Sequence, residues 1–232
     1  PFIGDDLIFN DVGLLNGKNT PVNDFAAATS FRSINFGNTA IGSYTVTGNS
    51  VTLDVASGGV SSDNASNVAA SNALNLNLIT ATNPQTITVK DGSTLNLGGT
   101  ISLVAAGPLT VTNGVGVDAN GTVIFNGTVN GAAVLTINMG GANGDSVFNA
   151  AVGGVTPLAS ISVTTVDDLT FASTLATTGN FTQTAGTSLT TLSGGTIGGV
   201  VNGTKEAISL GGVNLAVTGA ARALRPAGFS SG

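Results

Sequence analysis

The chain contains no cysteine and no histidine among its 232 residues. It therefore lacks the usual side chains for a zinc site or for haem ligation. It also lacks a thiol nucleophile and the general base of a Ser-His-Asp triad. We therefore predict that the chain is not an enzyme, and that it carries no cofactor and no metal.

Charged residues are also scarce. Charged residues make up 8% of the chain, with six basic and twelve acidic residues and a formal net charge of −6. The few basic residues are scattered, which argues against a nucleic-acid partner. No apolar run reaches the length of a membrane-spanning helix. No signal peptide is recognisable after Pro1, so we expect a mature chain or a fragment.

What is abundant points to strands and turns. Hydrophobic residues reach 41% and glycine contributes 34 residues, while threonine, serine and asparagine supply most of the polar surface. Thr86–Val89, Leu74–Leu78 and Val134–Ile137 each alternate apolar and polar side chains, as half-buried strands do. Such runs recur every 8 to 12 residues or so, with glycine or asparagine between them. This pattern predicts an all-β protein.

An internal repeat favours a solenoid among the all-β folds. Phe125, Phe148 and Phe171 recur about 23 residues apart, a period typical of repeat architectures. If each repeat is one coil, the three rings form a stacked column in the core. We therefore predict a right-handed parallel β-helix of roughly ten coils of about 23 residues, continuous over residues 1–232.

The same period makes finer predictions about which residues are stacked. It places Leu158 next to Leu135 and Phe181 next to Leu158, and it places Leu175 next to Val152. Residues Asp63 to Asn72 lose the alternation and are expected to form a long loop or a short helix.

Asn-Gly pairs allow a competing interpretation. Asn126-Gly127, Asn130-Gly131 and similar pairs could form two-residue hairpin turns, which would favour an antiparallel sandwich. In a solenoid the same residues supply the left-handed backbone needed at coil corners. The in-phase repeat favours corners.

Two parts of the chain resemble repeats of bacterial surface proteins. Residues 1–120 resemble the autotransporter-associated β-strand repeat, and the resemblance is carried by Asp6–Phe9, Asn23–Ala27, Phe31–Phe36, Tyr44–Leu53, Gln85–Val89 and Thr94–Leu97. Residues 121–219 are similar to the β-helix repeats of filamentous-haemagglutinin-like exoproteins, through Val123–Gly127, Val152–Gly154 and Pro157–Ile161. Residues 220–232 form an irregular tail. Both resemblances imply a right-handed parallel β-helix exported to the bacterial cell surface, and neither supplies a catalytic motif.

These observations predict a secreted or surface-displayed structural protein. It would be either the stalk of an adhesin or a protomer of an extracellular filament. One alternative is a carbohydrate-active β-helix enzyme, and another is an adhesin that binds a surface glycan without cleaving it.

The enzyme alternative depends on Asp145 and Asp168, which are also about 23 residues apart. Stacked on successive coils, they would have the carboxylate spacing of a retaining glycosidase, about 5 Å. The chain has no tryptophan and one tyrosine to serve as a sugar platform, so solvated corner residues are the simpler interpretation. Asp5-Asp6 and Asp167-Asp168 are candidate calcium ligands, although the nonapeptide calcium motif is missing. Ice binding would require a regular Thr-x-Thr ladder on one flat face, and none is visible in the sequence.

The two ends of the chain carry opposite charge. Asp5, Asp6, Asp11 and Asp24 lie near the start, and Arg222 and Arg225 lie near the finish. The ends of a solenoid expose unpaired strand edges. An acidic head could therefore dock on a basic tail, giving head-to-tail filaments.

Overall fold

The computed structural model describes residues 4–9, 19–37, 43–63, 70–90, 92–104, 107–113, 120–140, 143–203, 207–210 and 215–217. These residues form strands of two to six residues and no helix, so no described segment is a helix that could span a membrane. Every strand pairing is parallel. Thr, Val, Ile and Leu dominate the strands, and their alternation places one row of side chains inside and the next outside.

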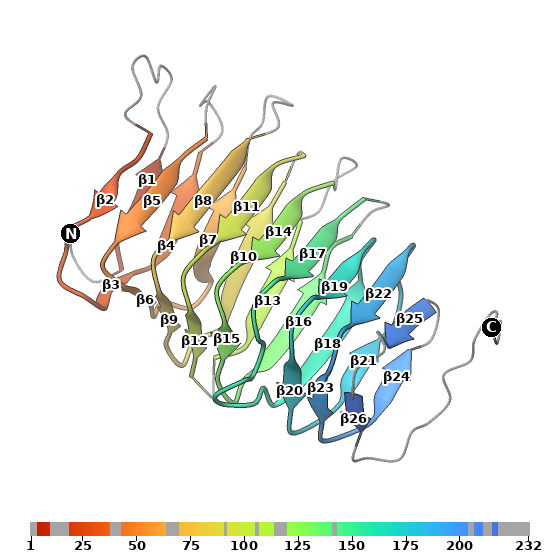
Figure 1. Cartoon of the computed structure of the whole chain (residues 1–232). Coiled ribbons are helices and arrows are strands. Elements are labelled where there is room, and N and C mark those ends of the chain that lie inside the picture. The colour runs from red at the N-terminus through yellow and green to blue at the C-terminus, as the bar shows by residue number, and fades with distance from the viewer. Residues whose placement is uncertain are drawn as a thin grey trace.

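The strands stack into three sheets that run the length of the molecule (Figure 1). Sheet A contains β1 (Asp6–Phe9), β4 (Ser33–Phe36), β7 (Gly58–Ser62), β10 (Gln85–Val89), β13 (Leu109–Thr112), β16 (Val134–Asn138), β18 (Ser160–Thr165), β21 (Phe181–Gln183) and β24 (Val201–Gly203). Sheet B contains β2 (Val22–Asn23), β5 (Thr45–Gly48), β8 (Ser71–Asn75), β11 (Thr94–Leu97), β14 (Thr122–Phe125), β17 (Asp145–Phe148), β19 (Leu169–Phe171), β22 (Leu189–Leu192) and β25 (Ala207–Leu210). Sheet C contains β3 (Thr29–Phe31), β6 (Val51–Leu53), β9 (Leu78–Thr80), β12 (Ile101–Leu103) and β15 (Val129–Asn130), followed by β20 (Leu175–Thr177), β23 (Gly195–Ile197) and β26 (Leu215–Val217). Val152 bridges β15 to β20 and makes sheet C continuous.

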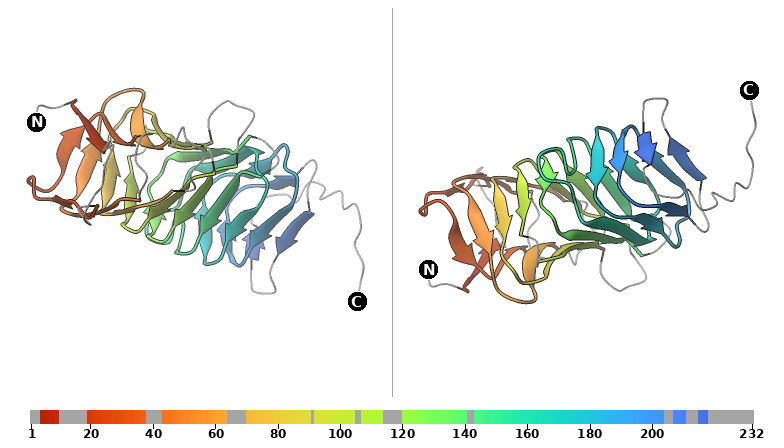
Figure 2. Two further views of the ribbon diagram at one scale, coloured as in Figure 1. Left: turned by 90° about the horizontal axis from the view of Figure 1, so that it is seen from above. Right: turned by 90° about the horizontal axis from the view of Figure 1, so that it is seen from below.

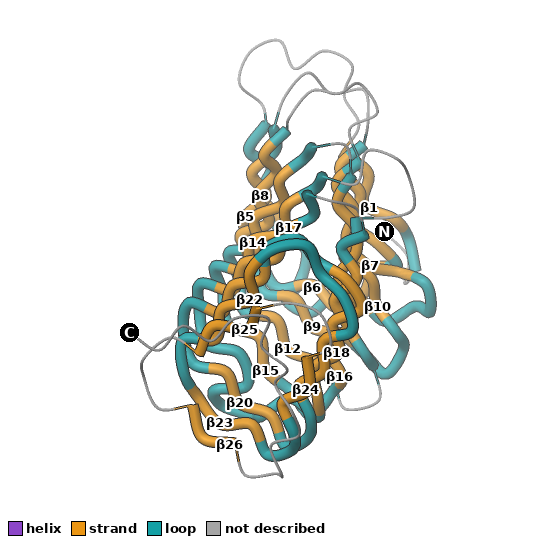
Figure 3. The backbone as a smooth tube through the Cα atoms, turned by 90° about the vertical axis from the view of Figure 1, so that its right-hand side faces the viewer, coloured by secondary structure: helices purple, strands orange, loops and turns teal. Residues whose placement is uncertain are grey.

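Each turn of the chain passes from sheet A to sheet B to sheet C and back to sheet A. Viewed from its C-terminal end, the chain winds counterclockwise as it approaches the viewer, so the coil is right-handed (Figure 3). The coils follow one another in chain order along the axis (Figure 2). The predicted right-handed parallel β-helix is confirmed, with nine strands in each of sheets A and B where roughly ten coils were predicted. Nine levels at the usual strand spacing span roughly 40 Å.

The inward-facing rows form one apolar core. Phe125, Phe148 and Phe171 occupy paired positions on β14, β17 and β19. Their rings stack nearly parallel, with centroids 4.3 Å and 4.6 Å apart. All three side chains are buried, because alternation on these strands turns them away from solvent.

Coil length varies, and this explains where the 23-residue period fails. Leu135 and Phe181 both pair with Ile161, whereas Leu158 bridges to Thr177. The predicted positions of Leu158 and Phe181 were therefore wrong. The corner that begins at Gly153, with φ +73°, contains extra residues before β18 starts, and the next coil is shorter. Leu175 does lie beside Val152.

Asparagine and glycine occupy corners, and the hairpin interpretation is wrong. The Asn149 amide donates to Oδ1 of Asn126 on the previous coil at 2.8 Å, a separation of 23 residues. At Gly131, with φ +130°, an added Cβ would lie 1.9 Å from the Leu103 carbonyl oxygen. Of the stretch from Asp63 to Asn72, which was expected to form a long loop or a short helix, Ser71 and Asn72 instead start strand β8. Residues 64–69 and the tail 220–232 lie outside the described residues.

Candidate functional site

The outward-facing side of sheet A carries two rows of small polar side chains. The register of the sheet places Ser33, Gly59, Thr86, Thr110, Thr136, Ser162 and Thr182 in the first row. It places Asn35, Ser61, Thr88, Thr112 and Asn138 in the second row. Thr86-x-Thr88 on β10 pairs with Thr110-x-Thr112 on β13, but Gly59, Ser162 and Asn138 take corresponding positions on other strands of the sheet. The described strands of sheet A therefore form no regular Thr-x-Thr ladder of the kind that ice binding would require.

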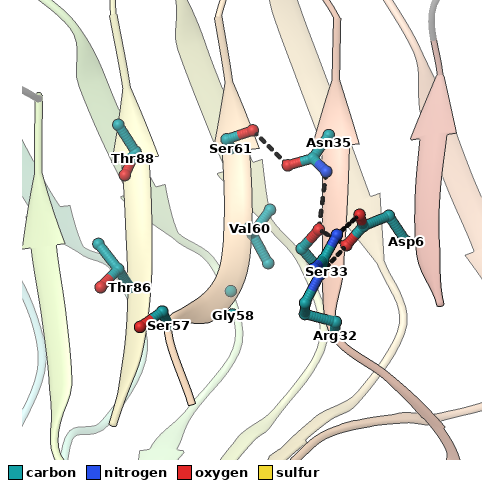
Figure 4. A pocket seen from close by; sticks show the side chains of 11 residues that line it. Asp6, Arg32, Ser33, Asn35, Ser57, Gly58, Val60, Ser61, Thr86 and Thr88 are labelled. Atoms are coloured by element: carbon teal, nitrogen blue, oxygen red, sulfur yellow. Dashed lines mark hydrogen bonds and ion pairs between the residues drawn. The ribbon is translucent and has the colours of Figure 1, made fainter. Parts of the chain in front are cut away.

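Gly59 leaves a gap in the first row, between Ser33 and Thr86. The gap opens a groove of about 310 Å³ across β1, β4, β7 and β10 (Figure 4). The groove is lined by Asp6, Arg32, Ser33, Asn35, Ser57, Gly58, Gly59, Val60, Ser61, Thr86 and Thr88. The Val60 side chain is itself buried in the core. The groove therefore offers hydroxyl, amide and charged groups and no exposed apolar side chain.

The backbone demands glycine at the floor of the groove. Gly59 has φ +146°, and a Cβ there would lie 1.8 Å from the Thr86 carbonyl oxygen. A Cβ at Gly58 would lie 1.9 Å from the Arg32 carbonyl oxygen. At the rim, Ser57 adopts φ +64°, which is uncommon for a residue with a side chain. The gap in the polar row is thus built into the strand and its preceding turn.

A chain of hydrogen bonds orders the side chains on one wall of the groove (Figure 4). The Ser33 hydroxyl donates to Oδ1 of Asp6 at 2.5 Å, and the Asn35 amide donates to the Ser33 hydroxyl at 2.7 Å. The Ser61 hydroxyl in turn donates to Oδ1 of Asn35 at 2.7 Å. These bonds join three successive coils and set which atoms of the wall donate and accept.

The two charged groups of the groove neutralise each other. Nε of Arg32 donates to Oδ1 of Asp6 at 2.8 Å, and Nη2 of Arg32 donates to Oδ2. The bond from Arg32, assisted by the one from Ser33, lowers the pKa of Asp6 to about 2. The Asp6 carboxylate raises the pKa of Arg32 in return. The groove therefore holds a fixed ion pair and no net charge at neutral pH.

The structure brings Asp145 and Asp168 together where the neighbouring strands β17 and β19 begin. The Asp168 N–H donates to Oδ1 of Asp145 at 3.1 Å. The Leu189 N–H donates to Oδ1 of Asp168 at 3.0 Å, repeating the contact one coil on. Thr187 donates its hydroxyl to Asp167 at 2.6 Å. Each carboxylate thus caps a backbone N–H of the following coil or accepts a hydroxyl.

Carboxylate oxygens of Asp145, Asp167 and Asp168 lie within 4.8 Å of one another. Burial raises the pKa of Asp145, and the neighbouring charges of Asp167 and Asp168 raise it further. The bonds from the Asp168 N–H and the Thr122 side chain act in the opposite direction. The three oxygens could contact one divalent cation. None of the three lines the groove on sheet A.

The proposed end-to-end charges are only partly placed. Asp6 is paired with Arg32 within the chain, so its charge is not available to a neighbouring molecule. Asp5 and Asp24 lie on exposed parts of the N-terminal end. Asp11, Arg222 and Arg225 lie outside the described residues.

Sequence reasoning missed the groove on sheet A. Its lining comes from four coils, and serine, threonine and asparagine are too common in this chain to draw attention. The available signal was Gly58-Gly59, where the strand needs a backbone that only glycine adopts easily.

Comparison with known proteins gave no match. No protein-family model matches the chain, and no curated protein or solved structure was found to be similar. The functional argument therefore rests on the fold and on the geometry described above.

Proposed function

We propose that the chain is a structural rod of the bacterial cell exterior, either the stalk of an adhesin or a protomer of a filament. The observation that supports this proposal is the stack of nine parallel levels around one apolar core. A solenoid of this kind is quasi-one-dimensional, because each coil contacts mainly its neighbours. It can hold two points apart without a compact catalytic centre.

The rod draws its cohesion from repetition. Backbone ladders connect every level to the next, and buried rings such as Phe125 and Phe148 stack between levels. The chain has no cysteine, so it forms no disulfide. The resemblance to autotransporter-associated and haemagglutinin-like repeats supports placement outside the cell.

Self-association is the finer part of the proposal. At the N-terminal end, β1, β2 and β3 are the outermost strands of their sheets, and no described helix covers them. Leu7, Phe9 and Phe25 are only partly buried there. Uncovered parallel edges and apolar groups favour addition of another solenoid in the same orientation.

Electron microscopy of the purified chain tests the rod and its assembly together. We expect rods that associate end to end, with an axial repeat close to the length of one molecule. Monodisperse short rods would favour the stalk over the filament. Labelling of intact bacteria with an antibody against the chain tests the location, and labelling only after cell lysis would contradict an extracellular role.

The absence of catalysis remains a proposal with its own test. Asp145 and Asp168 bond to backbone groups of successive coils, which gives both a structural task. We expect no cleavage of a panel of plant, algal and bacterial polysaccharides. Cleavage that disappears in Asp168→Asn would establish the carbohydrate-active alternative instead.

A further inference from the structure

The groove on sheet A has the chemistry of a binding site for a neutral saccharide. It crosses four neighbouring coils, and its walls present hydroxyl groups from Ser61, Thr86 and Thr88 and an amide from Asn35. Hydroxyl groups both donate and accept hydrogen bonds, as do the hydroxyl groups of a sugar. We propose that this groove binds a segment of a neutral glycan. The inference deepens the adhesive side of the proposed function.

The charged residues of the groove do not favour an anionic ligand. Asp6 and Arg32 are the only charged residues that line the groove, and they form a two-point ion pair. A phosphate, sulfate or carboxylate would have to compete with Asp6 for the guanidinium group. The rest of the lining is uncharged, so electrostatic attraction for an anion is missing.

The groove is equally unsuited to apolar ligands and to added peptide strands. No large apolar side chain is exposed in its lining, because Val60 faces the core. Strand β7 at its centre is already paired with β4 on one side and with β10 on the other. A peptide therefore finds no open edge for strand addition at the centre of the groove, and the open edge of β1 lies only at the end of it.

The geometry suits a short saccharide segment. A volume of about 310 Å³ lies at the lower end of the range for small-ligand sites. The hydrogen-bonded series Asp6–Ser33–Asn35–Ser61 fixes one wall before any ligand arrives. Such preorganisation reduces the entropy lost when side chains are immobilised on binding. Thr86 and Thr88 supply the opposite wall from β10.

The test compares two double variants on the same sheet. Asn35→Ala/Thr88→Val removes polar groups from both walls of the groove. Thr110→Val/Thr136→Val removes two hydroxyls from the same outer face but outside the groove. Both changes are on the solvent side of strands, and circular dichroism and electron microscopy verify that each variant keeps the rod. If the first variant does not fold, Thr88→Val alone takes its place.

Binding is measured by calorimetry with gluco-, manno-, galacto- and xylo-oligosaccharides, with heparin as the anionic comparison. We expect at least one neutral oligosaccharide to bind. The groove variant should weaken that binding by on the order of tenfold, because it removes two or more hydrogen-bonding groups. The control variant should bind as the natural chain does.

Three results would overturn the proposal. The first is a folded rod that binds none of the neutral oligosaccharides, and the second is binding of heparin alone. The third is binding that survives the groove variant or falls equally in the control. Since the shape of the rod is measured separately, a failure of glycan binding is distinct from a failure of the rod itself.

Discussion

Phe148 shows how one side chain connects three coils. It lies between Phe125 and Phe171, and its ring contacts both at stacking distance. Truncation to alanine would remove both contacts and leave a cavity that the backbone ladders prevent from collapsing. We expect Phe148→Ala to reduce the free energy of unfolding by about 3–5 kcal/mol.

Chemical denaturation measures this loss directly. Val155→Ala is the matched control, since Val155 is 86% exposed, and we expect a change within about 0.5 kcal/mol. A loss below about 1 kcal/mol at Phe148 would show that the column contributes little to the stability of the core.

Asp6 provides a charge with a defined pH dependence. Its pKa is lowered to about 2 in the folded chain, so the carboxylate contributes stability above its ordinary pKa. That contribution is lost as the pH falls towards about 2. We expect Arg32→Ala to return the Asp6 pKa towards its ordinary value, because it removes the bonds that hold the ionised form. Carboxyl NMR titration measures the shift, and an unchanged Asp6 pKa would contradict the ion pair.

The pKa of Asp145 is shifted in the opposite direction to that of Asp6. Because its pKa is raised in the folded chain, its charged form opposes folding once the pH rises above that pKa. Asp145→Asn keeps an oxygen for the Asp168 N–H and removes the repulsion from Asp167 and Asp168. We therefore expect Asp145→Asn to melt at a higher temperature than the natural chain at pH 7, with the difference vanishing in acid. If Asp145→Asn instead melts at a lower temperature than the natural chain only when calcium is added, the three carboxylates hold a cation.

At the scale of the element, the corners between strands restrict which residues the backbone accepts. Gly131 directly follows β15 at φ +130°, and the Leu103 carbonyl of the previous coil occupies the space of a Cβ. We expect Gly131→Ala to reduce the free energy of unfolding by about 1–3 kcal/mol, from backbone strain and the shift of one coil. Gly140→Ala is the control, since its Cβ would lie 3.7 Å from the Asn113 side chain, an ordinary contact. Equal unfolding free energies for the two variants would contradict this account.

The strands could be predicted from sequence because alternation is a local property. Thr86–Val89 and Val134–Ile137 form strands as expected, since alternate apolar residues of each face the core, although Val134 itself is exposed. The pairing of strands is not local. It depends on how many residues each corner consumes, and the corner after Val152 shifted Leu158 and Phe181 away from their predicted neighbours.

The candidate site was harder to predict for the same reason. Only the register of β4, β7 and β10 places Asn35, Ser61 and Thr88 in one row. None of these residue types is rare in this chain, so the row has no recognisable sequence motif. Asp145 and Asp168 were found because their corners happen to be equal in length. The sequence therefore predicted which side chains are neighbours only where the repeat is regular.

At the scale of the whole molecule, the orientation of β1 decides whether rods can join. The carbonyls of Asp5 and Phe9 accept hydrogen bonds from the N–H groups of Arg32 and Gly37, which flank β4. These two carbonyls therefore point towards β4. Backbone groups alternate in direction along a strand, so the N–H of Ile8 points to the uncovered edge. The Ile8 side chain is 62% exposed and packs little. A proline at this position would remove an edge donor while leaving the pairing with β4 intact.

We therefore expect Ile8→Pro to abolish or shorten filaments while leaving the melting temperature of the single rod within a few degrees. Proline on an edge strand prevents the addition of another strand. Val155→Pro lies on an exposed corner far from the end, and it tests whether any proline has the same effect. Sedimentation velocity and electron microscopy measure the length distribution of all three chains. Filaments of unchanged length in Ile8→Pro would show that the rods do not join through β1, and the acidic N-terminal end would then lose its part in assembly.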